Sequence, residues 1–94
     1  MAKGLDDIIK KLERARDLLR KKQDENARQI VSDLLNDPGL PEGLEQVFTN
    51  VHNRLKKDLN EPQNRQQAGI SIGTAINSVA SEQLERSKAK QKEQ

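Results

Sequence analysis

Few residues in this chain could do chemistry, and the strongest candidate stands alone. His52 is the only histidine, and it follows Val51 on the flank of an apolar helical stripe. A metal or catalytic role would need a second histidine, a cysteine or a glutamate at ligand spacing, and the local sequence has none. We therefore interpret His52 as a boundary or surface histidine. The chain also has no cysteine, which excludes disulfides, zinc–thiolate sites and thiol catalysis.

Two carboxylate pairs, Asp6–Asp7 and Asp24–Glu25, are the next candidates. General acid–base catalysis needs a carboxylate in a pocket that shifts its pKa. Both pairs lie among basic residues on polar faces, so we interpret them as solvated charges. The sequence therefore predicts a protein that is not an enzyme, with no catalytic residue, no cofactor and no metal.

A small-residue motif, Gly69-x-x-x-Gly73, has the spacing found in dimers of membrane helices. Gln66, Gln67 and Asn77 flank it, which argues against a membrane. Glycine weakens a helix by about 1 kcal/mol relative to alanine, but it lets another backbone come close. Two interpretations stay open: close packing of this helix against a neighbour, or a contact site for a partner.

The composition indicates one small domain with an aliphatic core. Of the 94 residues, 32% are hydrophobic and 34% are charged, and Phe48 is the only aromatic. Such a chain suits thin helices that each contribute one stripe to a shared core. We expect Phe48 to be buried, because it lies at the centre of the cleanest apolar stripe. Without Tyr or Trp anchors, partner recognition would depend on shape, small residues and charge.

The net charge of +2 and its distribution argue against nucleic acid as a partner. Basic ends surround an acidic middle, and acids interrupt the basic cluster. Attraction to an anionic membrane surface stays open, although no stretch approaches 18 apolar residues. The first residues contain no apolar run, so no signal peptide is expected. With no cysteine either, we expect a cytoplasmic protein. The basic cluster consists of Arg14, Arg16, Arg20, Lys21, Lys22 and Arg28.

Apolar residues at helical spacing predict helices over residues 5–22, 24–36, 44–59 and 64–84. Asp24 is a candidate N-cap for the second helix. The alternative is one long helix over residues 5–36, because no glycine or proline lies in between. The fold class is therefore all-α, a small antiparallel bundle of three to four amphipathic helices with a disordered basic C-terminal tail.

The fourth helix carries the candidate binding residues. Its predicted core face consists of Ile72, Ala75, Ile76, Val79, Ala80 and Leu84, and a separate hydroxyl face follows at helical spacing. We divide the chain into a bundle over residues 1–86 and a flexible polar tail over residues 87–94. The candidate partner-binding residues are Gly69, Ser71, Gly73, Thr74, Ser78, Ser81, Arg86 and Lys88.

One stretch resembles a known family. The run from Arg28 to Asp37, RQIVSDLLND, resembles the start of the immunity proteins that protect producers of class IIa (pediocin-like) bacteriocins, of the enterocin A immunity type. Residues 44–57, Pro62 and residues 72–84 are similar to the next two helices and the proline-bearing turn of that family. The resemblance covers about residues 27–85.

The resemblance implies a cytosolic antiparallel four-helix bundle that protects its own bacterium. It implies action on the complex between a bacteriocin and a sugar-transport permease, not on the free peptide. The chain departs from the family by a helix before the matching start, by the lack of the family's last helix and C-terminal segment, and by its few aromatics.

Two other classes of function stay open. One is a self-assembling structural or adaptor subunit of a phage, secretion or regulatory complex, with the chain as a homo-oligomer. The other is an accessory protein for nucleic acid or a membrane surface that uses the basic ends. The leading prediction is a non-catalytic module that binds a protein partner.

Overall fold

The computed structural model describes the backbone of residues 4–92 and the side chains of residues 5–87. Within this part, four α-helices follow one another, with one short 3-10 turn and no strand. Their bounds are α1 Gly4–Arg20, α2 Asp24–Leu35, η1 Glu42–Leu44, α3 Glu45–Leu55 and α4 Pro62–Lys92.

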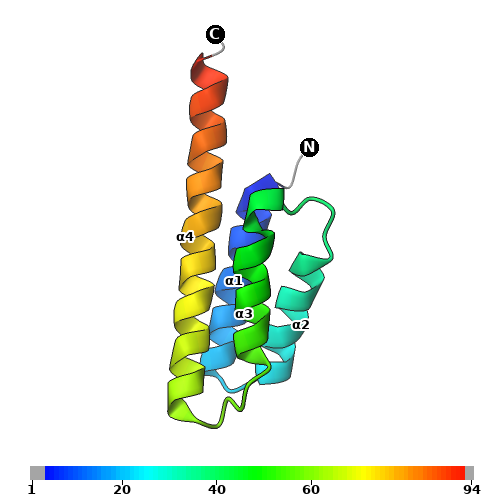
Figure 1. Ribbon diagram of the computed structural model, residues 1–94, viewed down its shortest axis with the longest axis vertical. Helices are drawn as coiled ribbons and strands as arrows, with labels where there is room; N and C mark the ends of the chain where they lie inside the picture. Colours follow the sequence, from blue (N-terminus) through cyan, green and yellow to red (C-terminus); the bar gives the residue numbers. More distant parts are fainter. Residues whose placement is uncertain (1–3, 93–94) are drawn as a thin grey trace.

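The helices form an antiparallel bundle in which the chain runs alternately down and up (Figure 1). α1 packs against α2 and α4, and α3 packs against the same two helices. The four helices therefore form a closed ring in chain order, with α4 back beside α1. This arrangement confirms the predicted all-α bundle. No helix between residues 4 and 92 is both long and apolar enough to cross a membrane.

The core is apolar throughout the described part of the chain, where no polar or charged residue is buried. Within each helix the buried residues are spaced alternately by three and four, which is the spacing of coiled-coil packing. Phe48 is fully buried, as predicted. The buried residues of the helices are Leu5, Ile8, Leu12, Ala15 and Leu19 in α1, Ala27, Val31 and Leu34 in α2, Phe48, Val51 and Leu55 in α3, and Ala68, Ile72, Ala75 and Val79 in α4.

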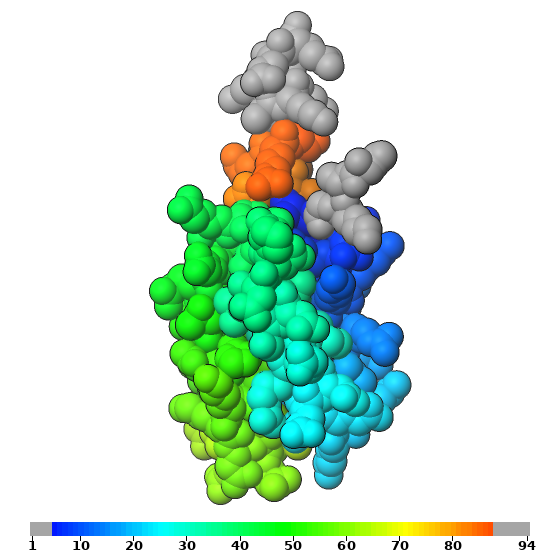
Figure 2. All heavy atoms as spheres, turned by 90° about the vertical axis from the view of Figure 1, so that its right-hand side faces the viewer, coloured from blue at the N-terminus to red at the C-terminus, as the bar shows by residue number. Residues whose placement is uncertain are grey.

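α4 differs from its prediction at both ends. Its helix begins at Pro62, where a fixed φ and a missing N–H suit the first helical position. At the other end it continues to Lys92, so the predicted flexible tail is helical as far as the described chain reaches. No glycine or proline follows Gly73, and Glu, Gln, Lys and Ala favour helix. The red and orange end of α4 stands clear of the other helices (Figure 1), and its orange part projects beyond them in Figure 2.

The predicted core face of α4 is wrong at its C-terminal end. Ala80 is exposed, and Leu84 keeps 56% of its surface accessible. Ala68, which the sequence analysis did not select, is fully buried instead. The true stripe begins one turn earlier, at Ala68, and Ala80 and Leu84 lie outside it because they are about 100° and 140° around the helix from Val79.

The break between α1 and α2 is real, so the alternative of one long helix is wrong. Lys22 has a φ of 64°, in the left-handed region. The Gln23 N–H donates to the carbonyl of Leu18 at 2.9 Å, and the Lys22 N–H donates to the carbonyl of Leu19 at 3.1 Å. These are the two hydrogen bonds of a Schellman motif, in which lysine occupies the position that glycine usually takes.

Asp24 is not the predicted N-cap, because it is already the first residue of α2. Its carboxylate instead accepts two hydrogen bonds from the Arg65 guanidinium, at 2.7 and 3.1 Å. The same guanidinium donates to the carbonyl of Leu19 at 2.8 Å. The hydrogen bond to Asp24 raises the pKa of Arg65. Arg65 therefore fastens the first turn of α4 to the α1–α2 turn.

α3 ends at Leu55, earlier than the predicted residue 59. Leu59 lies in the following turn, yet it is buried, so it belongs to the core without belonging to the helix. The turn is held by Asp58, whose carboxylate accepts from the Asn60 N–H at 3.1 Å and whose carbonyl accepts from the Asn64 side chain at 3.0 Å. Apolar spacing alone does not show whether a buried residue such as Leu59 lies in a helix or in the turn that follows it.

Replacing Lys22 with glycine should raise the free energy of unfolding by about 0.5–1 kcal/mol. The left-handed conformation costs a non-glycine residue roughly 1–2 kcal/mol, which exceeds the extra backbone entropy of glycine in the unfolded chain. Urea denaturation followed by circular dichroism measures the change. As the control, Arg14→Gly on the exposed face of α1 should lose about 1 kcal/mol. Equal losses for both variants would contradict the strained turn.

Phe48→Ala should lower the free energy of unfolding by about 3–5 kcal/mol, because it removes the largest buried side chain and leaves a cavity. In a domain with a stability of about 5–10 kcal/mol, this comes close to unfolding. Phe48→Leu, which keeps most of the apolar volume, should lose clearly less. Denaturant titration gives both values. A loss below roughly 1 kcal/mol for the alanine variant would contradict the central role of this ring.

Candidate functional site

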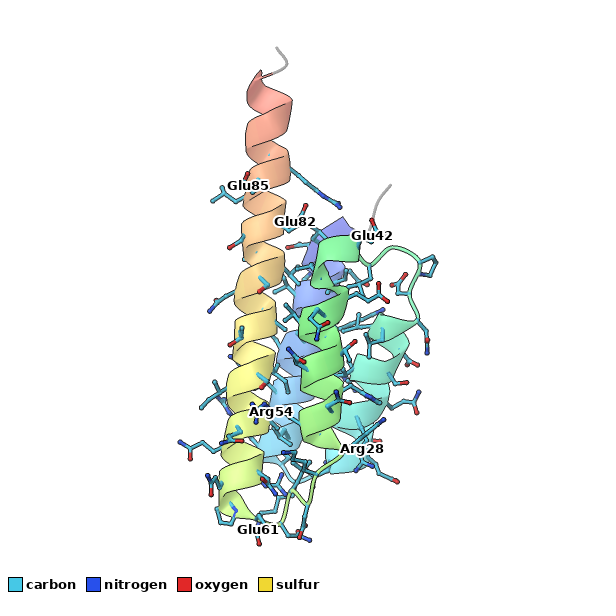
Figure 3. All side chains as sticks on the ribbon, viewed as in Figure 1. Arg28, Glu42, Arg54, Glu61, Glu82 and Glu85 are labelled. Atoms are coloured by element: carbon cyan, nitrogen blue, oxygen red, sulfur yellow. The ribbon has the colours of Figure 1, made fainter. Side chains whose placement is uncertain are left out.

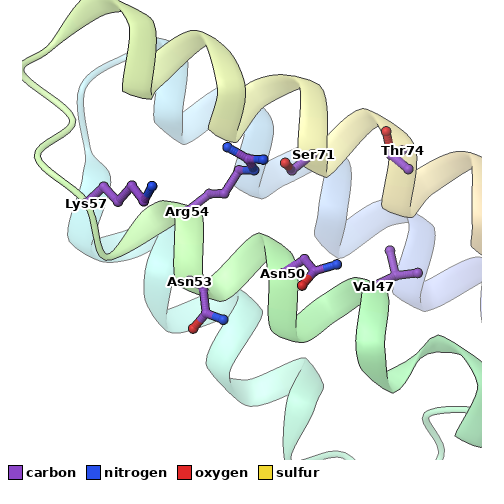
Figure 4. Close-up of a pocket in the computed structure, with 7 residues that line it drawn as sticks. All are labelled: Val47, Asn50, Asn53, Arg54, Lys57, Ser71 and Thr74. Carbon is purple, nitrogen blue, oxygen red and sulfur yellow. The ribbon is translucent and has the colours of Figure 1, made fainter.

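A groove of about 450 Å³ runs along the surface between α3 and α4. Figure 4 shows the polar side chains of both helices around it. Ser71 and Thr74, two of the predicted binding residues, form its α4 side. The residues that line it are Val47, Asn50, Asn53, Arg54, Lys57, Ser71 and Thr74.

The α4 side of the groove follows from the position of the core stripe. Ile72 and Ala75 point into the bundle, so Ser71 and Thr74 lie on the flank that faces α3. Ser71 is half-buried and Thr74 is exposed. The Thr74 hydroxyl donates to the carbonyl of Ile70 at 3.1 Å, one turn earlier. Its lone pairs are therefore the part of this side chain that is open to a ligand.

The α3 side consists of residues that the sequence analysis did not select. Asn50, Asn53, Arg54 and Lys57 lie at positions i, i+3, i+4 and i+7, which places them on one face of the chain around α3. This spacing could have indicated a binding face from the sequence, but most polar helix faces are exposed to water and bind no partner. Arg54 donates to the Gln67 side chain at 2.6 Å, which links the two walls of the groove.

The groove offers hydrogen bonds and positive charge. Its two cations, Arg54 and Lys57, lie at one end, and Val47 and Thr74 lie at the other (Figure 4). Two amides and a serine hydroxyl lie between these ends. Such a set of groups suits a polar or acidic segment of a protein, which can accept from the cations and amides.

The two predicted glycines lie on the opposite flank of α4, against α1. A Cβ built on Gly69 would meet Leu19 Cδ2 at 4.0 Å, and one built on Gly73 would meet Arg16 Nη1 at 3.9 Å. Both distances are ordinary contacts with side chains of α1, so α4 packs against α1 here without needing a glycine for close approach of the backbones. The glycines and the hydroxyls therefore belong to two different surfaces.

The remaining predicted residues of α4 are not part of the groove lining. Ser78 is half-buried and Ser81 is exposed. Arg86 is exposed, and its Nε lies 3.3 Å from Glu82 Oε2 on the same helix. The backbone of Lys88 is helical, and its side chain lies outside the described part of the structure. Of the predicted hydroxyl and basic residues, Ser71 and Thr74 are thus the two that line a groove with α3, whereas Gly69 and Gly73 line a groove of about 450 Å³ with Arg16, Leu19 and Arg20 of α1.

His52 lies in a second groove between α2 and α3, of about 400 Å³. It is half-buried there, and Arg28 and Ser32 line the same groove. Arg28 Nε is buried without a hydrogen-bond partner. Burial lowers the pKa of His52, and the positive charges of Lys56 and Arg28 lower it further. A neutral histidine is therefore the form that the folded chain favours.

The basic residues of the sequence do not form one patch. Arg28 faces α3 beside His52, whereas Arg16 lies against α4 beside Gly73. Within the described residues, no group of three or more His, Cys, Asp or Glu side chains is placed to hold a metal ion. The groove between α3 and α4 is thus the surface where two of the predicted hydroxyl residues meet amides and cations of a second helix.

The pKa of His52 makes a testable link between pH and stability. Because its pKa in the folded chain is below the usual value of about 6.5, the unfolded chain takes up this proton more readily. The free energy of unfolding should therefore fall as the pH is lowered below about 6.5. Urea denaturation at pH 7.5 and 5.5 should show a larger loss for the unmodified chain than for His52→Gln. Equal losses, or a gain on acidification, would contradict this assignment.

The chain was compared with protein-family models, with curated proteins and with solved structures, and none of the three comparisons gives a match.

Proposed function

We propose that this chain is a non-catalytic protein-binding module that presents the groove between α3 and α4 to a partner protein. The observation that carries the proposal is the meeting of Ser71 and Thr74 with the amides and cations of α3 in one groove. This groove combines hydrogen-bond donors, acceptors and positive charge, and part of its surface is apolar through Val47. These are the properties of the polar rim and the centre of a protein interface.

The specific form that we propose is an immunity protein of the pediocin-like bacteriocin type, which acts in the cytosol of the producer. The support is the resemblance over about residues 27–85, which covers α2, α3 and most of α4. α1 precedes this stretch and supplies the fourth helix of the ring. α1 thus packs against both α2 and α4 and closes the ring of helices.

The partner in this proposal is a permease occupied by a bacteriocin. The cations Arg54 and Lys57 at one end of the groove would pair with acidic side chains of such a partner. The hydroxyl groups of Ser71 and Thr74 would accept or donate hydrogen bonds beside them. Selectivity between bacteriocins would then depend on the α4 side of the groove.

Expression of the chain in a bacteriocin-sensitive Gram-positive host should confer resistance to a pediocin-like peptide. The peptide should remain intact, because the proposal includes no hydrolysis. The triple variant Ser71→Glu, Thr74→Glu, Ser78→Glu should abolish the resistance, since added negative charge opposes an acidic partner. Growth inhibition across a panel of class IIa peptides is the measurement, with circular dichroism to show that the helix content is kept.

The matched control adds the same three charges elsewhere. Asn36→Glu, Asn60→Glu, Gln63→Glu changes exposed residues away from the groove and should keep full resistance. Loss of resistance in both variants would point to a general charge effect and contradict the groove as the site. Sensitivity of the host to every peptide of the panel would contradict the immunity function and favour the adaptor subunit.

A further inference from the structure

The outer face of α4 is unlike any other exposed surface of this chain. From Gln66 to Ser81 there is no charged side chain, although 34% of all residues are charged. Ile70 on this face keeps 61% of its surface accessible, and Leu84 keeps 56%. They are the two large hydrophobic residues that the described part of the chain leaves exposed. A solvated helix face would carry charges instead.

Ile70 and Leu84 belong to a regular stripe in which Gly73 is half-buried and the other members are exposed. Ile70, Gly73, Asn77, Ala80 and Leu84 are spaced by three and four, as the core residues of a coiled coil are. Ile70 and Asn77 each follow a buried residue, Ala68 and Ala75, by two positions, which is about 200° on a helix. Gly73 and Ala80 follow the buried Ile72 and Val79 by one position, which is about 100°. α4 thus has one seam that the bundle covers and a second, opposite seam that it leaves open.

Three residues of the open seam, Ile70, Asn77 and Leu84, are placed symmetrically along α4. α4 spans Pro62–Lys92, and Asn77 is the middle residue of this span. Ile70 lies one heptad before Asn77 and Leu84 lies one heptad after it. If a second α4 is laid antiparallel on the first with the two Asn77 residues opposite each other, Ile70 of each copy meets Leu84 of the other. The two helices then overlap over their whole described length, about four heptads.

Gly73 supports the same arrangement. Packing within the bundle does not require a glycine there, because a Cβ would find 3.9 Å of space to Arg16. A glycine inside a helix nevertheless costs about 1 kcal/mol relative to alanine. In the antiparallel pair Gly73 comes to the level of Ser81 of the second copy, next to Ala80, and these small residues let the helix axes approach closely.

Charge complementarity also favours a second copy. Glu85 lies two heptads after Ser71, on the α3 flank of α4, and it points away from the bundle (Figure 3). In the antiparallel pair it comes to the level of Gly69 on the same flank of the other copy. Arg54 is at this level, since it is hydrogen-bonded to Gln67, and Lys57 follows it. Each Glu85 would therefore face the basic end of the groove of the other copy.

We propose that α4 is the interface of a two-fold symmetric, antiparallel dimer of this chain, centred on Asn77. The part of α4 that stands clear of its own bundle then lies on the α4 of the second copy. This inference goes beyond the proposed binding function and does not depend on it, because Ile70, Asn77 and Leu84 do not line the groove between α3 and α4, and Glu85 alone would approach its basic end.

Analytical ultracentrifugation of the full chain over a range of concentrations tests the dimer. The unmodified chain should sediment as a dimer in equilibrium with a monomer. Leu84→Glu should shift the dissociation constant upward by more than tenfold with unchanged helix content, because it puts two charges into the seam. Gln83→Glu adds the same charge one residue away, at an exposed position off the seam, and should leave the constant within about twofold.

Disulfide trapping tests the orientation, since the natural chain has no cysteine. Asn77→Cys should form a covalent dimer on mild oxidation. Ile70→Cys alone and Leu84→Cys alone should not, whereas a mixture of these two should give the covalent heterodimer. Asp33→Cys, exposed on α2, should stay monomeric and serves as the control.

Two results would overturn the proposal. A monomer at every concentration would show that a second copy does not cover the seam. Efficient trapping of Ile70→Cys with itself would show a parallel pair and contradict the two-fold axis at Asn77. Neither result would bear on resistance to bacteriocins, so the dimer and the proposed function fail independently.

Discussion

The structure is constrained by the small amount of apolar surface that is available in the chain to form a core. With 32% hydrophobic residues and one aromatic, each helix can offer only a single stripe, and four stripes must meet to exclude water. No polar side chain is buried in the described part, so the interior gains nothing from internal hydrogen bonds between side chains. The ring of four helices is the arrangement in which every stripe faces two neighbours at once.

The ring also requires α4 to pack beside α1, and Arg65 provides a polar contact that holds them together at one end. It joins the start of α4 to Asp24 and to the carbonyl of Leu19, both at the turn between α1 and α2. The pair with Asp24 is largely shielded, with 21% and 23% of the two side chains accessible. Because this contact lies at one end of the bundle, it fixes the position of α4 along its axis. The groove with α3 and the overhang at the other end both follow from that position.

The number and type of the helices could be predicted from the sequence, because apolar spacing decides them directly. The break at Lys22 could not be decided, since the residue that adopts the left-handed conformation there is not a glycine. The Asp24 carboxylate could accept hydrogen bonds from the first N–H groups of a helix, as an N-cap does. It accepts from Arg65 instead, and only the fold brings Arg65 close to it. Ser71 and Thr74 could be selected from the hydroxyl pattern of their own helix. Asn50 and Arg54 could not, because the groove that they line forms only when α3 packs against α4.

The single aromatic ring has a consequence for how this protein can be observed. With no Tyr or Trp, the chain is nearly silent in near-ultraviolet absorbance and in intrinsic fluorescence. In a proton NMR spectrum, however, every signal from a phenyl ring must come from Phe48, which is completely enclosed between the helices. A close-packed interior lets such a ring turn over only when its surroundings briefly expand. The ring-flip rate of Phe48 therefore reports how often the packed core of the bundle expands, and it can be measured without attaching a label.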